Sequence, residues 1–559
     1  MPLTSPYNFV PINTRIYYPS WGNLVSMDVP FEDGEDGYIE VILRNVSPLF
    51  TRNGAPLERE KETESSYVID ANGDKRYFIP GTTIKGMLRG TLEMMAFGKI
   101  KEKEHYTNRW FGYRDVAQKT AESRAYVERA RQGKPGWLNK EGDKYYFTPC
   151  IGTLEKISVW ELKEIYPRYY ANKSIWKTNC SLSGGKEPSY PEYQDESGKR
   201  YRIVCTGKMQ RKKNELLFPS QTSEKRILLS EDTVNAFLTV YENTPDFSKF
   251  RAVLERRGTV PVFYLDSKNG SMPVIGLSKM FRIPYKHSLT DMIRYDQQPD
   301  DKCLDLCEVL FGTVHGIEDM QSFKGRIQIG HAFAARQVAA DQLLKVSGVL
   351  GQPKASYYPL YVKQDTNPYK TYDTGTRLSG RKLYRIHKGA STTDLPRGNE
   401  NANVKSFFYA LPAGNQFVLR INVHNLKKVE IGALLSALTL NDAEGAYHNL
   451  GLAKSYGYGK IHIDEIKLHH LSFTAQEYES AFEQEMDAFV SEQIKSGLKW
   501  RETEQVVQLT NILREHDDDV VKLMPLGDSK TEGTYGYYKD KRNFKDTVID
   551  RLTEPRNKV

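Results

Sequence analysis

Two short segments hold the residues best suited to binding an anion. In the first, IPGTTIKGMLR, a Pro80-Gly81 turn precedes apolar residues that recur at helical spacing, which predicts a helix beginning at this turn. The first backbone N–H groups of a helix lack intrahelical partners and attract negative charge. Lys85 and Arg89 add positive charge one turn apart, so a nucleic-acid phosphate is a natural ligand. An ordinary capped helix with two solvated basic residues would have the same sequence.

The second segment, GLAKSYGYGK, spans residues 451–460 and is rich in glycine. Its glycines permit close approach of another backbone, while its lysines and tyrosines offer charge and ring faces for stacking. A dinucleotide-binding fingerprint is excluded, because the glycine spacing differs and the following IHIDEI predicts a strand where that fingerprint needs a helix. A tight β-hairpin turn is the alternative interpretation. The candidate nucleic-acid contacts here are Lys454, Tyr456, Gly457, Tyr458, Gly459 and Lys460.

The elements around these segments predict an α+β architecture. A strand with alternating apolar residues begins at residue 38, another covers NQFVLRINVHNL, and a helix covers EIGALLSALTLN. Residues 113–228 are rich in Lys, Arg, Glu and Tyr and predict an inserted, β-containing, loop-rich region. Residues 466–559 are helical in pattern and highly charged, and they predict a tail outside the β-rich body. The expected divisions are therefore 1–112, 113–228, 229–465 and 466–559.

Composition is compatible with a phosphate-rich partner without requiring one. The chain has 559 residues, a formal net charge of +8, 39% hydrophobic residues and 35 tyrosines. No segment has the length and composition of a signal peptide or a membrane span, so a cytoplasmic protein with no membrane partner is expected. The five cysteines are expected to be free thiols. Zinc is not expected, because no CxxC pair occurs.

The two segments, in this order, resemble the signatures of the CRISPR-associated RAMP superfamily. IPGTTIKGMLRG is similar to the IPGSSLKGxxR signature, and GLAKSYGYGKI is similar to the C-terminal glycine-rich loop of the same superfamily. Between them, Leu310-Phe311-Gly312 followed by KGRIQIGHAF looks like an element of the backbone-type subunits of type III effector complexes. GTRLSGRKLYRIHKG stands where that family carries a glycine- and arginine-bearing crossover, and ALPAGNQFVLRI matches one of its strands.

The resemblance implies a ferredoxin-like, RRM-related core with large insertions, either as one enlarged unit or as two fused units. It implies binding of CRISPR RNA by basic and glycine-rich loops, with Arg377 and Arg381 of the crossover added to the candidate contacts. The implied partners are the CRISPR RNA, a target RNA and other CRISPR effector subunits in a ribonucleoprotein complex.

Type III backbone subunits cut target RNA with a loop aspartate that lies shortly before the IPG segment. In this sequence the corresponding loop holds Asp70 and Glu64 as the catalytic candidates, in that order, beside further acids. Such an acid would act with Mg²⁺ or Mn²⁺ as cofactor. However, Glu64-Ser65-Ser66-Tyr67 replaces the usual aspartate-bearing motif. The alternative interpretation is that these acids are solvated loop side chains with no catalytic role. The remaining acids of the loop are Glu58, Glu60, Glu62 and Asp74.

Two other functions fit parts of the sequence. A RAMP endoribonuclease that processes CRISPR RNA would use a histidine as general acid–base, although the histidines show no diagnostic arrangement. A scaffold subunit could instead dock a protein partner through the charged segment 466–559. The histidines within the RAMP-like body are His315, His331, His387, His424 and His448.

Overall fold

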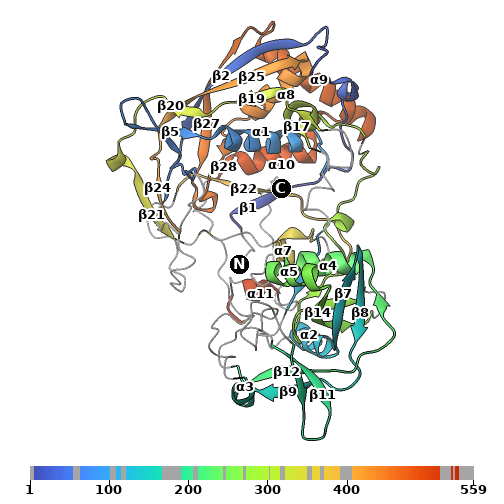
Figure 1. The fold of residues 1–559 in the computed structure, drawn as a ribbon. Helices are drawn as coiled ribbons and strands as arrows, with labels where there is room; N and C mark the ends of the chain where they lie inside the picture. The colour runs from blue at the N-terminus through green and yellow to red at the C-terminus, as the bar shows by residue number, and fades with distance from the viewer. Residues whose placement is uncertain are drawn as a thin grey trace. The chain divides into compact units, whose positions relative to one another are not determined.

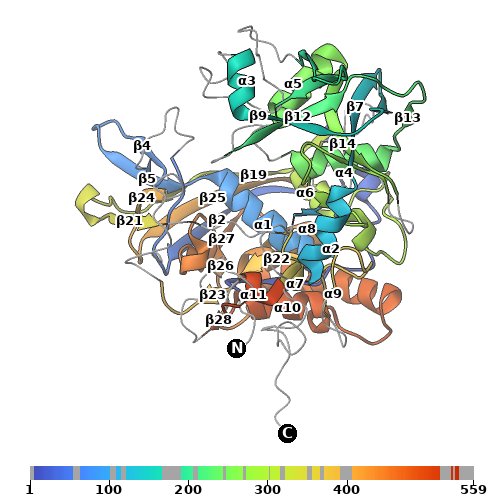
Figure 2. The ribbon, with the colours of Figure 1, turned by 90° about the horizontal axis from the view of Figure 1, so that it is seen from below.

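The computed structural model describes most of the chain and divides it into two compact units. Unit 1 comprises Met1–Lys103, Ile293–Tyr369 and Arg377–Val559, and unit 2 comprises Glu104–Met292 and Lys370–Thr376. Figures 1 and 2 show the ribbon from two directions. The described residues are 5–53, 63–100, 109–114, 121–166, 190–205, 212–242, 247–267, 272–300, 302–314, 322–348, 350, 355–364, 370–390, 406–516, 530–532 and 535–539.

Unit 1 is built on an antiparallel sheet whose central strands run in the order β27-β2-β25-β20. These strands are β27 (Lys460–His469), β2 (Glu35–Asn45), β25 (Gln416–Leu426) and β20 (Ala332–Ala334). Helix α1 (Gly81–Met95) lies between β2 and β20 in the chain, and α8 (Lys428–Thr439) lies between β25 and β27. The resulting β-α-β-β-α-β order is that of a ferredoxin-like core, as the sequence predicted. β2 has the expected alternation, because Ile39, Val41 and Leu43 are fully buried and the residues between them face away.

Helices cover one face of this sheet and fill the main hydrophobic core. In α1, Ile84, Leu88 and Leu92 are fully buried at intervals of four residues, the spacing that predicted the helix. α8 contacts α1, and nearly all of its residues are buried. Figure 1 shows the two helices on the same side of the sheet. Its buried Glu430 pairs with the equally buried Arg326, so neither charge is left uncompensated in the core.

The C-terminal segment contains the predicted helices, but they do not form a tail outside the body. α9 (Ala475–Gln493) packs directly on α8, where the carbonyl oxygen of Tyr478 lies so close to Gly432 that no side chain would fit there. Phe482, Met486 and Trp500 are fully buried in the same core as α1 and α8, and the Trp500 indole donates to the carbonyl of Met95. α10 (Glu504–Leu513) also packs against α1. The high charge of the segment misled the prediction, because only the outward faces of these helices are charged.

Unit 2 contains two larger sheets with helices, and β6 (Gly112–Tyr113) pairs with β16 (Ile283–Pro284) in a two-stranded sheet. A five-stranded sheet of order β13-β8-β7-β14-β15 is packed against α4 (Glu231–Tyr241) and α5 (Phe247–Arg257). A four-stranded sheet of order β10-β11-β12-β9 is packed against the short helix α3 (Val159–Ile165). A further cluster joins residues of both sheets with α2 (Ala121–Arg131). The strands are β7 (Lys134–Glu141), β8 (Lys144–Pro149), β9 (Glu155–Ser158), β10 (Glu192–Gln194), β11 (Arg200–Val204), β12 (Asn214–Pro219), β13 (Ile227–Leu228), β14 (Thr259–Leu265) and β15 (Val274–Gly276).

The boundary between the two units lies elsewhere than the sequence suggested. The predicted insertion ended at residue 228, but α4, α5 and the β14–β15 hairpin beyond it share the core of β7 and β8. Within the part of the chain that the structure describes, no helix is long and apolar enough to cross a membrane. The described cysteines, Cys150, Cys205, Cys303 and Cys307, are free thiols as predicted, and Cys180 lies outside the described residues.

Candidate nucleic-acid interface

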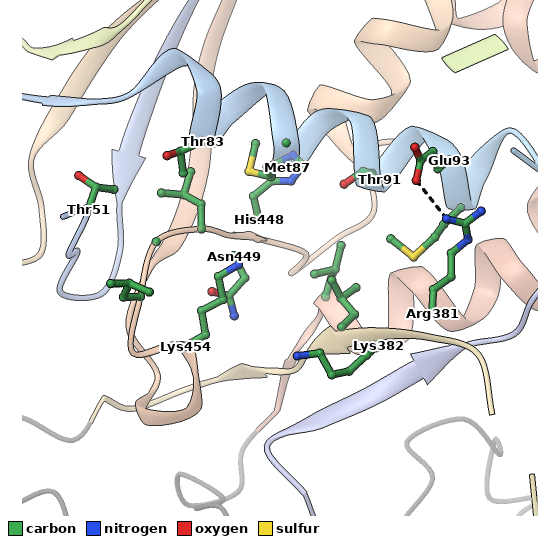
Figure 3. A pocket seen from close by; sticks show the side chains of 18 of the residues that line it. Thr51, Thr83, Met87, Thr91, Glu93, Arg381, Lys382, His448, Asn449 and Lys454 are labelled. Atoms are coloured by element: carbon green, nitrogen blue, oxygen red, sulfur yellow. Dashed lines mark hydrogen bonds and ion pairs between the residues drawn. The ribbon is translucent and has the colours of Figure 1, made fainter. Parts of the chain in front are cut away.

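A groove of about 640 Å³ in unit 1 brings together parts of both predicted segments. One wall is α1, and the others come from the glycine-rich segment and from β22 (Arg381–Tyr384). Figure 3 shows Thr83, Met87 and Thr91 projecting from α1, with Lys382 and Lys454 on the opposite side. Segments more than 350 residues apart in the sequence therefore form a single concave surface.

The α1 wall has an unusually open helix surface. Gly86 and Gly90 both line the groove, and a Cβ atom added to either would meet nothing within 4 Å. Glycine in a helix costs about 0.5–1 kcal/mol relative to alanine, so two glycines on this face reduce the stability of the helix. In return, a ligand can approach the helix backbone closely between Thr83 and Met94.

Two lysines make the opposite wall electropositive. Burial lowers the pKa of Lys454 to about 8, and burial together with the nearby charge of Lys454 lowers that of Lys382 to about 8. The Lys382 ammonium lies over the rings of Tyr384 and Tyr7, at 4.4 and 5.4 Å from the ring centroids. Neither lysine has an ion-pair partner among the described residues. A bound phosphate would supply the counter-charge that both lack.

Arg381, a predicted contact, reaches the groove but is held by a carboxylate. Its Nη1 lies 3.0 Å from Oε2 of Glu93, while Nε of Arg89 lies 2.9 Å from Oε1 of the same carboxylate. The dashed line in Figure 3 marks the first of these pairs. Glu93 thus fixes Arg381 against α1 and leaves its second guanidinium nitrogen donating to the carbonyl of Gly98 at 3.0 Å.

Lys85 and Arg89 lie on α1 beside the face that lines the groove. Lys85 donates to the carbonyl of Phe311 at 3.2 Å, and burial with the neighbouring charge of Arg89 lowers its pKa. Arg377 is exposed and also lies outside the groove lining. The structure therefore does not gather these three residues with Lys454.

In the glycine-rich segment, only Lys454 of the predicted side chains lines the groove. Tyr456 and Tyr458 are buried in a hydrophobic cluster with Phe50 and Phe408, so their rings are not available for stacking on a base. Lys460 is also buried, where it pairs with Glu515 and donates to the carbonyl of His387. The predicted contacts at these three positions are therefore wrong as surface contacts. Their pattern reflects a packed turn.

Gly457 and Gly459 have the conformational role that the sequence predicted. Their φ angles are +79° and +81°, values at which other residues are strained. A Cβ atom at Gly457 would lie 2.3 Å from the carbonyl oxygen of Gly389, and one at Gly459 would lie 1.8 Å from that of Leu450. The backbone that approaches these glycines is the protein's own, so they shape the loop that presents Lys454.

Sequence reasoning missed Lys382, Thr83 and Asn449 among the groove residues. Lys382 immediately follows the predicted Arg381 in GTRLSGRKLYRIHKG, the segment that stands at the place of the family's glycine- and arginine-bearing crossover. That resemblance pointed to the segment, but no spacing rule distinguishes the lysine that is packed between two tyrosines from its neighbours.

The two candidate catalytic acids are engaged in local structure. Asp70 closes the turn between β4 (Tyr67–Ile69) and β5 (Lys75–Ile79), where Oδ1 accepts the backbone N–H groups of Asn72 and Asp74, each at 2.9 Å. Glu64 forms an ion pair with Lys75. Among the described residues, no group of three His, Cys, Asp or Glu side chains could hold a metal ion. Asp70 is thus engaged in a turn and Glu64 in an ion pair, and Glu58, Glu60 and Glu62 lie outside the described residues.

The histidines give little support to acid–base catalysis. His448 reaches the groove wall, but burial lowers its pKa to about 4 and its Nε2 donates to the carbonyl of Leu438 at 2.8 Å. A neutral, hydrogen-bonded imidazole of this kind is a poor general acid near pH 7. Nδ1 of His331 accepts the N–H of Gly81, and His424 pairs with Asp36. His387 is buried, and His315 lies outside the described residues.

Comparison with known proteins identifies the family. The family model of the RAMP superfamily matches residues 42–462, well over half of the chain. The chain therefore belongs to the RAMP superfamily, and it is a CRISPR-associated protein of the RNA-binding kind. The match includes α1, β22 and the whole glycine-rich segment, and so includes all three walls of the groove. No curated protein matches the chain significantly.

Proposed function

We propose that this protein is a guide-RNA-binding subunit of a type III CRISPR effector complex, and that it holds the CRISPR RNA backbone in the groove of unit 1. The observation that carries the proposal is the pair of partly buried ammonium groups, Lys382 and Lys454, facing an open helix surface. The groove is lined by the segments whose sequences resemble RAMP signatures. Single-stranded RNA offers the phosphates that such a pair can bind.

Other effector subunits and a target RNA belong to the same proposal. β4 lies at the edge of the main sheet, where Val68 and Ile69 are exposed to 40% and 59%. An exposed apolar edge strand is a surface that a neighbouring subunit can cover. A target RNA would pair with the guide that the groove presents.

Cleavage of the target by Asp70 is not part of the proposed activity, because its carboxylate is occupied by the hairpin turn. If Asp70→Ala lost Mg²⁺-dependent target cutting but still bound RNA, Asp70 would be shown to be catalytic after all. The processing-endonuclease alternative is not favoured, since the histidine at the groove stays neutral.

The test replaces Lys382 and Lys454 together with alanine in the full chain. Binding of a short single-stranded guide RNA would be measured by filter-binding titration over a range of salt concentrations. We expect lower affinity and a weaker salt dependence. The negative slope of log K against log salt should become shallower by roughly 1.4, since each phosphate contact on a single strand contributes about 0.7.

The matched control removes two lysines on another part of unit 1, Lys467 and Lys495. Lys467 pairs with Glu465 on β27, and Lys495 is exposed beyond α9. This control variant has the same net charge as the test variant and should bind RNA like the unchanged protein. Equal binding by the test variant and the control variant would contradict the groove as the RNA site.

A further inference from the structure

The main sheet of unit 1 has an outer face, opposite to the face that α1 and α8 cover. Alternation along β25 buries Phe417, Leu419 and Ile421 in the core beneath these helices and directs Val418 and Arg420 outward. Both outward residues are exposed, Val418 to 40%. A ligand can therefore reach this part of the sheet from solvent.

Arginine side chains lie over aromatic rings on this outer face. The guanidinium carbon of Arg420 lies 3.7 Å from the ring centroid of Tyr38, and that of Arg76 lies 4.7 Å from the ring centroid of Phe333. The ring of His469 stacks on Tyr38, with centroids 4.3 Å apart and an angle of 9° between the planes. Both arginines are exposed. Each planar guanidinium is thus held against a ring while part of it stays open to solvent.

The two arginine–ring pairs occupy adjoining positions of the sheet. Phe333 on β20 lies opposite Val418 on β25, and Arg420 follows Val418 by two residues on the same face. Side chains two residues apart on a strand are separated by about 7 Å. The pairs therefore form one continuous surface of cationic and aromatic groups. We call this surface the outer-face patch, and it consists of Tyr38, Arg76, Phe333, Val418 and Arg420.

The two arginines of the outer-face patch form no ion pair within the described part of the chain. Nε of Arg420 donates to Oδ1 of Asn422 at 2.9 Å, which leaves its terminal nitrogens available. Glu40 lies opposite Arg420 in the register of β2 and β25, at the border of the patch. Beyond it, Lys467 pairs with Glu465 on β27, so the unpaired positive charge ends at β2.

We propose that the outer-face patch is a second binding site for unpaired RNA, on the opposite side of the sheet from α1. Bases stack on the guanidinium planes and on the ring of Phe333, while the arginine nitrogens attract the adjacent phosphates. Neither contact depends on base identity, so the site has no sequence preference. An acidic polypeptide would use the charges but not the planar surfaces, whereas unpaired RNA uses both.

The experiment measures binding of labelled oligouridylate to the full chain in which Lys382 and Lys454 are already alanine, so that the groove does not mask the patch. Adding Arg420→Ala should lower the remaining affinity by roughly five- to 150-fold, the range expected for losing one stacked base. Arg420→Lys keeps the charge but has no planar group, and it should lose most of the same affinity. Both changes should leave the melting temperature unaltered, because the side chain is exposed.

A matched control is Arg501→Lys, also in unit 1. The Arg501 side chain is 44% exposed, but its guanidinium is already paired with Glu483. This control should leave oligouridylate affinity unchanged. Photo-crosslinking with 4-thiouridine in the oligonucleotide, followed by peptide mass spectrometry, should give crosslinks at Phe333 or Tyr38 that Arg420→Ala reduces.

Three results would overturn the proposal. Unaltered affinity in Arg420→Ala would remove the outer-face patch as an RNA site and leave the proposed groove untouched. Full affinity in Arg420→Lys would show that the position supplies charge without stacking. Equal binding of polyglutamate that is likewise lost in Arg420→Ala would show a protein-docking surface in place of an RNA site.

Discussion

Lys382 and Lys454 illustrate how burial and repulsion prepare an anion site. Each ammonium has lost hydration without gaining a carboxylate, so the protonated form is held at a free-energy cost until an anion arrives. Part of the binding free energy of a phosphate is thus relief of that cost. An exposed lysine on the same surface would offer charge without this gain.

A pH dependence follows at the residue scale. Because the pKa values of Lys382 and Lys454 are lowered to about 8, both ammonium groups lose their protons as the pH rises from 7 to 9. Only the charged form attracts phosphate, so RNA affinity should fall over this interval. The measurement is a binding titration with oligoadenylate, whose bases do not lose protons there.

The alanine double variant at these positions should show a flat profile across the same interval. A flat profile in the unchanged protein, or an equal fall in both proteins, would mean that these lysines do not contact the RNA.

Residue roles were the least predictable part of the sequence. Lys454 and Lys460 are six residues apart in one glycine-rich segment, yet one lines a groove and the other pairs with Glu515 in the interior. Asp70 was a reasonable acid candidate from its position in the chain. In the structure its carboxylate instead accepts the backbone N–H of Asn72, two residues later, and so closes a turn. The roles of the two lysines depend on which distant segment packs nearby, and the local sequence does not contain that information. The role of Asp70, in contrast, is set by its own turn.

At the scale of elements, α1 combines a firmly packed face with an open one. Ile84, Leu88 and Leu92 anchor the helix, while Gly86 and Gly90 leave two positions of its groove face without a side chain. Gly86→Leu should therefore leave stability unchanged or raise it slightly, since the new Cβ atom would meet nothing within 4 Å and leucine favours helix by about 0.5–1 kcal/mol over glycine. The same change should reduce RNA affinity by filling the groove, as measured by thermal melting and filter binding.

Two further variants serve as controls for Gly86→Leu. Thr82→Leu, at an exposed position of α1 outside the groove lining, should affect neither measurement. Gly459→Ala should lower the melting temperature, because its Cβ atom would overlap the carbonyl oxygen of Leu450. If Gly86→Leu bound RNA normally, α1 would not be a wall of the binding site.

Helices and strands were far more predictable than residue roles. The alternation in β2 and the four-residue spacing in α1 reflect burial on one face, which periodicity reports directly. The same reasoning found helices after residue 466 but misplaced them, since α9 shows four buried residues, Tyr478, Phe482, Met486 and Val490, among many charges. A stripe of four apolar residues at this spacing is enough to predict a helix. It does not indicate which part of the molecule the helix packs against.

For the whole molecule, Trp500 tests whether the C-terminal helices belong to the RAMP core. Its side chain is fully buried beside Phe482, and its indole hydrogen bond reaches Met95 at the end of α1. Trp500→Ala should destabilise unit 1 by about 3–5 kcal/mol, as measured by chemical denaturation. The matched variant Val507→Ala, at a position 38% exposed on α10, should cost far less. A small effect of Trp500→Ala would support the segment as an independent tail.

The distance along the chain between β2 and its neighbours has a consequence during synthesis on the ribosome. Both strands that hydrogen-bond to β2 come from residues 416–469, whereas β2 ends at Asn45. At about 5–20 residues per second, β2 waits on the order of tens of seconds for its partners, with Ile39, Val41 and Leu43 unburied. Nearly all of unit 2 is contiguous and leaves the ribosome earlier. Nascent-chain folding should therefore begin in unit 2, and the ferredoxin-like core, with its high contact order, should close last.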